Sequence, residues 1–115
     1  MTLRIIAMAA VASLLASAAH AQPSDTRRAD LRCMLGFMAL LQNPAYKDAA
    51  TAGLMYYVGR LDGREPDLEL ATAIKREAGN MATADYMTEA QRCGRALKER
   101  SAALKAAGEG LRSGR

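Results

Sequence analysis

The residues with most chemistry to offer lie in one stretch, Gly53–Ala71, which reads GLMYYVGRLDGREPDLELA. Within it two arginines are interleaved with acids, and the four charges that could act together are Arg60, Asp62, Arg64 and Glu65. An arginine offers a carboxylate or phosphate two parallel N–H donors, so this set is a possible interaction site. The same residue types also occur where helices end and begin. The stretch is therefore either a binding site or a junction between two helices.

The junction is the interpretation that the neighbouring residues favour. Leu61 is the last apolar residue of a helical period, and Gly63 follows where a left-handed residue commonly ends a helix. Arg60 suits the negative end of that helix. Pro66 suits the first position of the next helix, where a missing N–H costs nothing. We expect these residues to have a structural role.

The rest of the chain offers few catalytic groups. Its only histidine, His20, lies in a segment that we expect to be removed, so the usual general base and metal ligand is absent. The serines lie in no nucleophile-elbow context. Pairs of carboxylates could do acid–base work or hold a hard cation. Acids beside arginines at helix starts are more typical of caps and surface ion pairs. We predict no catalytic residue, no metal site and no cofactor, and hence not an enzyme.

The first residues predict a secretory signal peptide. Arg4 provides a positive charge, Ile5–Leu15 is an apolar run broken by Ser13, and Ala19-His20-Ala21 has the small-x-small pattern of a cleavage site. A retained membrane anchor is the alternative, but a span needs about 20 apolar residues and this run is shorter. No later run is long enough either. We predict a signal peptide at 1–21 and a periplasmic protein without a membrane span.

Two cysteines, Cys33 and Cys93, remain after this removal. An even number of cysteines in a small exported domain is typical of a disulfide. Two free thiols or a redox pair are the alternatives, but the cysteines form no Cys-x-x-Cys motif. The mature chain has 15 basic and 12 acidic residues, a balance too mild for nucleic-acid binding.

Apolar residues at helical spacing indicate four helices. The first is capped by Ser24 and contains CMLGFMALL, a run without a polar side chain, which predicts a central helix buried on several sides. Its methionines could instead form an adaptable binding surface. The apolar positions of this helix are Leu31, Cys33, Met34, Leu35, Phe37, Met38, Leu40 and Leu41.

The second helix is expected to have Asn43 as its cap and Pro44 at its first position. Its apolar face consists of Tyr46, Ala50, Gly53, Leu54, Tyr57, Val58 and Leu61. The third helix is expected to begin at Pro66 and end at Gly79 and Asn80. Its apolar face consists of Leu70, Ala71, Ile74 and Ala78.

The fourth helix is the longest, with Thr83 as its cap and Gly108 and Gly110 as its end. Its inward positions are Tyr86, Ala90, Cys93, Leu97 and Leu104, and its outward positions are Arg92, Arg95, Lys98 and Glu99. Cys93 therefore faces the core, as a partner for Cys33 must. We predict an all-α four-helix bundle at 22–107, with one disulfide joining the first and last helices, and a flexible tail at 108–115.

Cys33-Met34-Leu35, the YYVGRLDGREP stretch and the late cysteine together resemble a group of small, exported, uncharacterised bacterial helical proteins. This resemblance covers most of the mature chain and implies an all-helical exported protein without a known activity. The layout of signal peptide, about ninety residues and one disulfide is more loosely similar to periplasmic acid-stress chaperones of the HdeA type. Those proteins differ in cysteine spacing and contain tryptophan, which this chain lacks.

Two functions follow as hypotheses. The first is a non-enzymatic periplasmic binding or interaction protein, for example a chaperone-like one, with a protein as its partner. The second is an envelope-associated protein whose basic C-terminal helix contacts an anionic membrane surface. The only tyrosine of that helix, Tyr86, faces inward, which argues against insertion into the membrane. The oligomeric state does not follow from the sequence.

Overall fold

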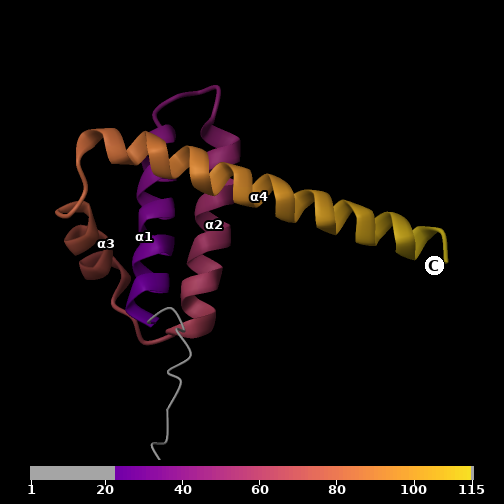
Figure 1. The fold of residues 1–115 in the computed structure, drawn as a ribbon, viewed down its shortest axis with the longest axis horizontal. Coiled ribbons are helices and arrows are strands. Elements are labelled where there is room, and N and C mark those ends of the chain that lie inside the picture. The colour runs from indigo at the N-terminus through magenta and orange to yellow at the C-terminus, as the bar shows by residue number, and fades with distance from the viewer. Residues whose placement is uncertain (1–22, 115) are drawn as a thin grey trace, which may run out of the picture.

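The computed structural model describes residues 23–114, and the predicted signal peptide at 1–21 lies outside this range. The described chain forms four helices: α1 (Pro23–Leu40), α2 (Lys47–Arg64), α3 (Leu70–Ala78) and α4 (Thr83–Arg112) (Figure 1). These residues contain no strand, and the prediction of an all-α fold is confirmed. The helices α1 and α2 run side by side, and α4 crosses them at a steep angle (Figure 1).

The helix α1 is the centre of the structure, as its apolar composition predicts. It packs against α2, α3 and α4, whereas the helices around it touch one another little or not at all. The buried core consists of Leu31, Cys33, Met34 and Phe37 of α1, Ala50, Tyr57 and Leu61 of α2, and Cys93 of α4. Because α1 supplies half of this core, loss of either flanking helix would uncover it.

Two glycines allow the helices to approach α1 closely. A Cβ atom added at Gly36 would lie 2.7 Å from the backbone nitrogen of Ala90 in α4. A Cβ atom added at Gly53 of α2 would lie 2.7 Å from the ring of Phe37. Something must shift to admit a Cβ at either position: the backbone of α4 at Gly36, and the buried ring of Phe37 at Gly53.

The predicted starts of the first two helices are wrong by a few residues. The helix α1 begins at Pro23, so Ser24 is the second residue of the helix and not its cap. The helix α2 begins at Lys47, three residues after Pro44. The reason is a separate turn, in which the Asn43 side chain accepts a hydrogen bond from Ala45 N (3.0 Å) and its carbonyl accepts one from Tyr46 N (3.0 Å).

The predicted junction after Leu61 is also wrong in its details. Gly63 lies inside α2, with φ outside the left-handed region, and the helix continues to Arg64. Glu65 then takes φ −138° and ψ 69°, outside the helical region, which the residue before a proline disfavours. Pro66 therefore ends α2 and does not begin α3. The helix α3 begins four residues later, where the Glu69 side chain accepts a hydrogen bond from Thr72 N (2.9 Å).

The helix α4 begins at Thr83, where the Asp85 carboxylate accepts a hydrogen bond from Ala82 N (2.7 Å). It does not stop at Gly108 and Gly110 but continues to Arg112, because a glycine costs a helix only about 1 kcal/mol. Beyond α2, its C-terminal half projects from the other helices (Figure 1). We call residues 98–112 the α4 arm. None of the helices in residues 23–114 has both the length and the apolar character to cross a membrane.

Candidate functional site: carboxylate clamps and a groove beside the disulfide

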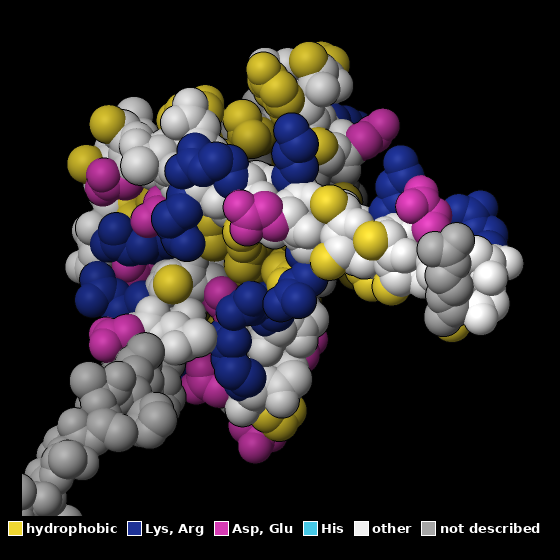
Figure 2. All heavy atoms as spheres, turned by 45° about the vertical axis from the view of Figure 1, so that its right-hand side comes forward, with side chains coloured by type: hydrophobic (Ala, Val, Ile, Leu, Met, Phe, Trp, Pro, Cys, Tyr) yellow, Lys and Arg dark blue, Asp and Glu magenta, His cyan; other side chains and the backbone are white. Residues whose placement is uncertain are grey.

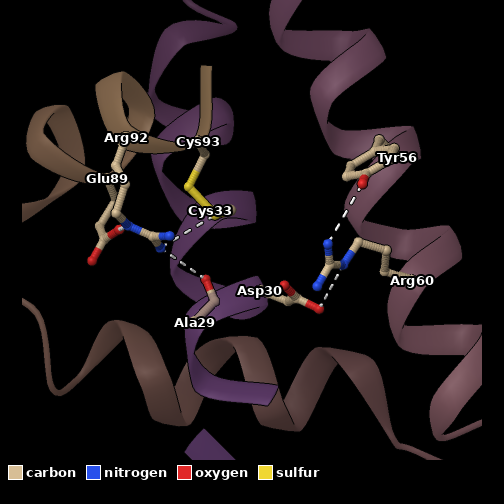
Figure 3. The surroundings of a disulfide bond; sticks show 8 residues. All are labelled: Ala29, Asp30, Cys33, Tyr56, Arg60, Glu89, Arg92 and Cys93. Atoms are coloured by element: carbon tan, nitrogen blue, oxygen red, sulfur yellow. Dashed lines mark hydrogen bonds and ion pairs between the residues drawn. A yellow bond between two sulfur atoms is a disulfide. The ribbon is translucent and has the colours of Figure 1, made fainter. Parts of the chain in front are cut away.

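Cys33 of α1 and Cys93 of α4 form the predicted disulfide, which joins residues 60 positions apart in the sequence. Their Cα atoms are 5.6 Å apart, and both residues are almost completely buried. Arg92 lies over the bond, and its Nη2 is 3.4 Å from both Cys33 Sγ and the carbonyl oxygen of Ala29 (Figure 3). The Nε of the same arginine donates to Glu89 (2.6 Å). A disulfide of this kind suits an oxidising compartment.

A buried carboxylate links α1 to α2. Asp30 of α1 is 3% exposed, and Arg64 of α2 forms an ion pair with it. Arg60, one turn earlier in α2, places its Nε 3.4 Å from the same carboxylate oxygen (Figure 3). Two arginines from one helix therefore hold an acid from another. We call such an arrangement a carboxylate clamp.

A second clamp links α1 to α3. Glu77 of α3 is 4% exposed and accepts hydrogen bonds from Arg32 Nε (2.6 Å) and Arg28 Nε (3.3 Å) of α1. Burial alone would raise the pKa of Glu77, but the two arginines outweigh it and hold the pKa below its ordinary value. The charged form of Glu77 is therefore the one that the folded structure favours.

A third clamp lies at the end of α2. Arg27 of α1 donates from Nε to both carboxylate oxygens of Glu65, at 2.8 and 3.0 Å, and its Nη2 pairs with the same carboxylate. The hydrogen bonds from Arg27 lower the pKa of Glu65. Asp30 of α1, Glu77 of α3 and Glu65, directly after α2, are thus each held by one or two arginines from another helix, and we use the term carboxylate clamp for all three.

The four candidate interaction residues were predicted to cap a helix junction, and the structure places most of them in contacts between helices. Arg60 and Arg64 both reach Asp30, and Glu65 binds Arg27, so three of them form interhelical ion pairs. Asp62 is exposed and forms no ion pair within residues 23–114. Arg60, Arg64 and Glu65 therefore join helices, where the sequence predicted the caps of a helix junction.

Their partners on α1 were missed from the sequence, although one signal was present. Asp30 stands at helical spacing from Met34 and Phe37, on the stripe that is buried against the other helices. A lone acid on a buried stripe needs a cationic partner. The arginines that follow the YYVG motif could have been identified as that partner.

A groove lies between α2 and α4, next to the disulfide. One part of the groove has a volume of about 300 Å³ and is lined by Tyr56, Tyr57, Arg60, Ala96, Glu99, Arg100 and Ala103. A second part, of about 340 Å³, shares three of these residues and extends past α1, where it is lined by Asp25, Thr26, Ala29, Asp30, Cys33, Tyr57, Arg60, Arg92 and Ala96. Sequence reasoning did not predict this groove, because it depends on how α4 crosses α2.

The α4 arm has a different character from the rest of the molecule. Leu104 and Leu111 are 70% and 80% exposed, although Leu104 was predicted to face the core. Four basic residues, Lys98, Arg100, Lys105 and Arg112, exceed its two acidic ones, Glu99 and Glu109. The ion pairs of the described chain involve none of these four basic residues. Figure 2 shows basic and hydrophobic side chains together on the surface of the projecting part of the molecule.

The acidic residues do not form a metal site in residues 23–114: no cluster of three or more His, Cys, Asp or Glu there could hold an ion. Comparison with known proteins found no matching family model, no matching curated protein and no matching solved structure. The arguments for function therefore rest on the geometry of this chain alone.

Proposed function

We propose that this chain is a non-enzymatic periplasmic binding protein with chaperone-like activity, which acid conditions switch on. The observation that carries the proposal is the set of three carboxylate clamps at Asp30, Glu65 and Glu77. Each clamp joins α1 to another helix, and together they fasten α2 and α3 over the central apolar surface. Protonation of Glu65 and Glu77 removes the charge that their arginines bind.

The direction of the pH effect follows from the clamps. The pKa values of Glu65 and Glu77 are lower in the folded chain than in an unfolded one. The clamps at Glu65 and Glu77 therefore stabilise the fold above the ordinary carboxylate range, near pH 4, and this stabilisation is lost as the pH falls through the lower, folded-state pKa values. We expect the helices to loosen below about pH 4 and to remain packed at neutral pH.

The disulfide limits how far the helices can separate at low pH. It keeps α1 joined to α4 after α3 and the end of α2 are released, because Cys33 and Cys93 do not titrate. The surface that becomes accessible is the apolar face of α1, which includes Leu31, Met34 and Phe37. Methionine adapts its shape to different contacts, so such a face suits clients of varied sequence.

Titration of the purified mature protein tests this proposal. Below about pH 4 it should bind a hydrophobic dye, retain far-ultraviolet helical signal and suppress aggregation of an unrelated client protein. At neutral pH the same protein should show none of these activities. A fold that stays tightly packed at about pH 2, without protection of the client, would exclude the proposal.

The α4 arm supports a second candidate function, contact with an anionic membrane surface. The two exposed leucines lie beside four basic residues that are free to meet negative charge. Each basic residue near such a surface contributes about 1 kcal/mol. The arm contains no aromatic residue to anchor it at the interface, which makes this function the weaker of the two.

Co-sedimentation with vesicles decides whether the arm has this function. Phosphatidylglycerol vesicles should carry the protein down at low salt, and phosphatidylcholine vesicles should not. A Leu104→Ser, Leu111→Ser variant should lose this binding and keep its melting temperature. Equal recovery with both kinds of vesicle, or with both forms of the protein, would exclude the arm as a membrane contact.

A further inference from the structure

The part of the groove nearest the α4 arm is built from both walls by groups that bind anions. Arg60 and the two tyrosines come from α2, and Arg100 comes from α4. The volume of about 300 Å³ admits a small ligand group. We propose that this groove binds an oxyanion group, a phosphate or a carboxylate, between the guanidinium groups of Arg60 and Arg100.

Arg60 is positioned by rings but only loosely bound by polar partners. Its Cζ lies 5.8 Å from the ring centroids of both Tyr56 and Tyr57. Its Nη1 is 3.5 Å from the Tyr56 hydroxyl, and its Nε is 3.4 Å from Asp30 (Figure 3). Both contacts are longer, and therefore weaker, than a typical hydrogen bond. Because Arg64 also holds Asp30, Arg60 can bind a ligand without leaving that buried acid unpaired.

Arg100 brings a second guanidinium to the groove from the first turn of the α4 arm. It is exposed, and no ion pair within residues 23–114 involves it. The pKa of the Tyr56 hydroxyl lies below its ordinary value, chiefly because Arg60 donates to it, with Arg100 acting in the same direction. Because Arg60 and Arg100 both line this part of the groove, a negative group bound there gains from both.

The residue types of the groove select an oxyanion over other ligands. A guanidinium binds carboxylates and phosphates through two parallel N–H bonds, and two of them enclose such a group from opposite walls. Glu99 is the acid in this part of the lining, so a cation would meet more repulsion than attraction. The adjoining part of the groove, of about 340 Å³, leaves room for the body of a small ligand beside Ala29 and Ala96.

Calorimetric titration at neutral pH, with inorganic phosphate and with citrate as the probes, tests this site. We expect saturable binding that Arg60→Ala and Arg100→Ala each weaken about tenfold or more, since each removes one of two bidentate donors. Arg60→Lys should also weaken binding, because lysine keeps the charge and loses the fork. Glu99→Gln should tighten it. The matched control is Arg95→Ala, an exposed arginine of α4 that does not line the groove.

A spectroscopic measurement separates this site from a general effect of charge. Bound anion should raise the pKa of Tyr56, because two negative groups would then share the site, and Tyr56→Phe should remove this change from the ultraviolet titration. Equal weakening by all three arginine-to-alanine changes, with circular dichroism unchanged, would overturn the site in favour of non-specific attraction. Binding to phosphatidylglycerol vesicles without binding to phosphate or citrate would also overturn it, and would assign the contact to the arm.

Discussion

The α4 arm and the rest of the described chain, residues 23–97, which we call the body, use basic residues in opposite ways. In the body, six arginines form ion pairs, and five of these arginines hold an acid of another helix. In the arm, four basic residues form none within the described chain, and two leucines lie open to solvent. The difference shows that charge in this protein has two roles: in the body it joins helices, and in the arm it remains available to a partner.

The largest expected effect on stability comes from removing the disulfide. Replacement of Cys33 and Cys93 by serine removes a link across 60 positions, for which the chain-entropy model gives about 4 kcal/mol. We expect a large drop in the melting temperature of the double variant, measured by circular dichroism. An unchanged melting temperature would mean that helix packing alone holds α1 to α4.

A pair of leucine variants compares the two regions directly. Leu61 of α2 is 1% exposed and Leu104 of the arm is 70% exposed. Leu61→Ala should lower the free energy of unfolding by about 2–5 kcal/mol, as a cavity in a core does. Leu104→Ala should change it by less than about 0.5 kcal/mol, as an exposed substitution does. Denaturant titration measures both, and similar losses would show that the arm packs against the body.

The contact between α1 and α4 provides a third test. Gly36→Ala introduces a Cβ that meets backbone atoms of Ala90 and Tyr86 at 2.7 and 2.9 Å. Such overpacking costs about 1–3 kcal/mol. The control is Gly59→Ala on α2, where a Cβ meets nothing within 4 Å and alanine should stabilise the helix by about 1 kcal/mol. Opposite signs of the two changes are expected, and equal signs would contradict the close approach of α4.

The smallest effect concerns a single clamp. Glu77→Gln leaves Arg28 and Arg32 without their carboxylate and should cost about 1–2 kcal/mol at neutral pH. Because the pKa of Glu77 is lowered in the folded state, the difference between variant and wild type should shrink as the pH falls below about 4. Glu109→Gln on the arm is the control, with no expected change in stability. A pH-independent difference would exclude Glu77 as a titrating group.

The sequence was sufficient to predict the four helices, the central position of α1 and the disulfide, because each depends on a local pattern. Apolar residues at helical spacing specify which face is buried, and two inward cysteines have no other partner. The helix ends were predicted less well. Ser24 and Gly63 are residue types common at helix ends, yet both lie inside helices here. Such residues also fit a continuing helix, so the adjacent turn decides where the helix ends.

The candidate sites were harder to predict for a different reason. Arg60 and Arg64 were recognised as notable, but their partner Asp30 lies 30 or more positions away, and the pairing depends on how α1 packs on α2. The groove depends on the crossing of α2 and α4. Local sequence patterns do not specify how two helices pack or cross. An acid on an apolar stripe does indicate, however, that a cation from elsewhere in the fold must pair with it.

The central claim is that protonation of Glu65 and Glu77 loosens the packing of the helices, and one variant tests it without acid. Glu65→Gln and Glu77→Gln together imitate this protonation at neutral pH. We predict that this double variant, with its disulfide intact, binds a hydrophobic dye and protects a client from aggregation at pH 7, as the wild type should below about pH 4. A double variant that stays tightly packed, or that loosens without protecting the client, would contradict the account.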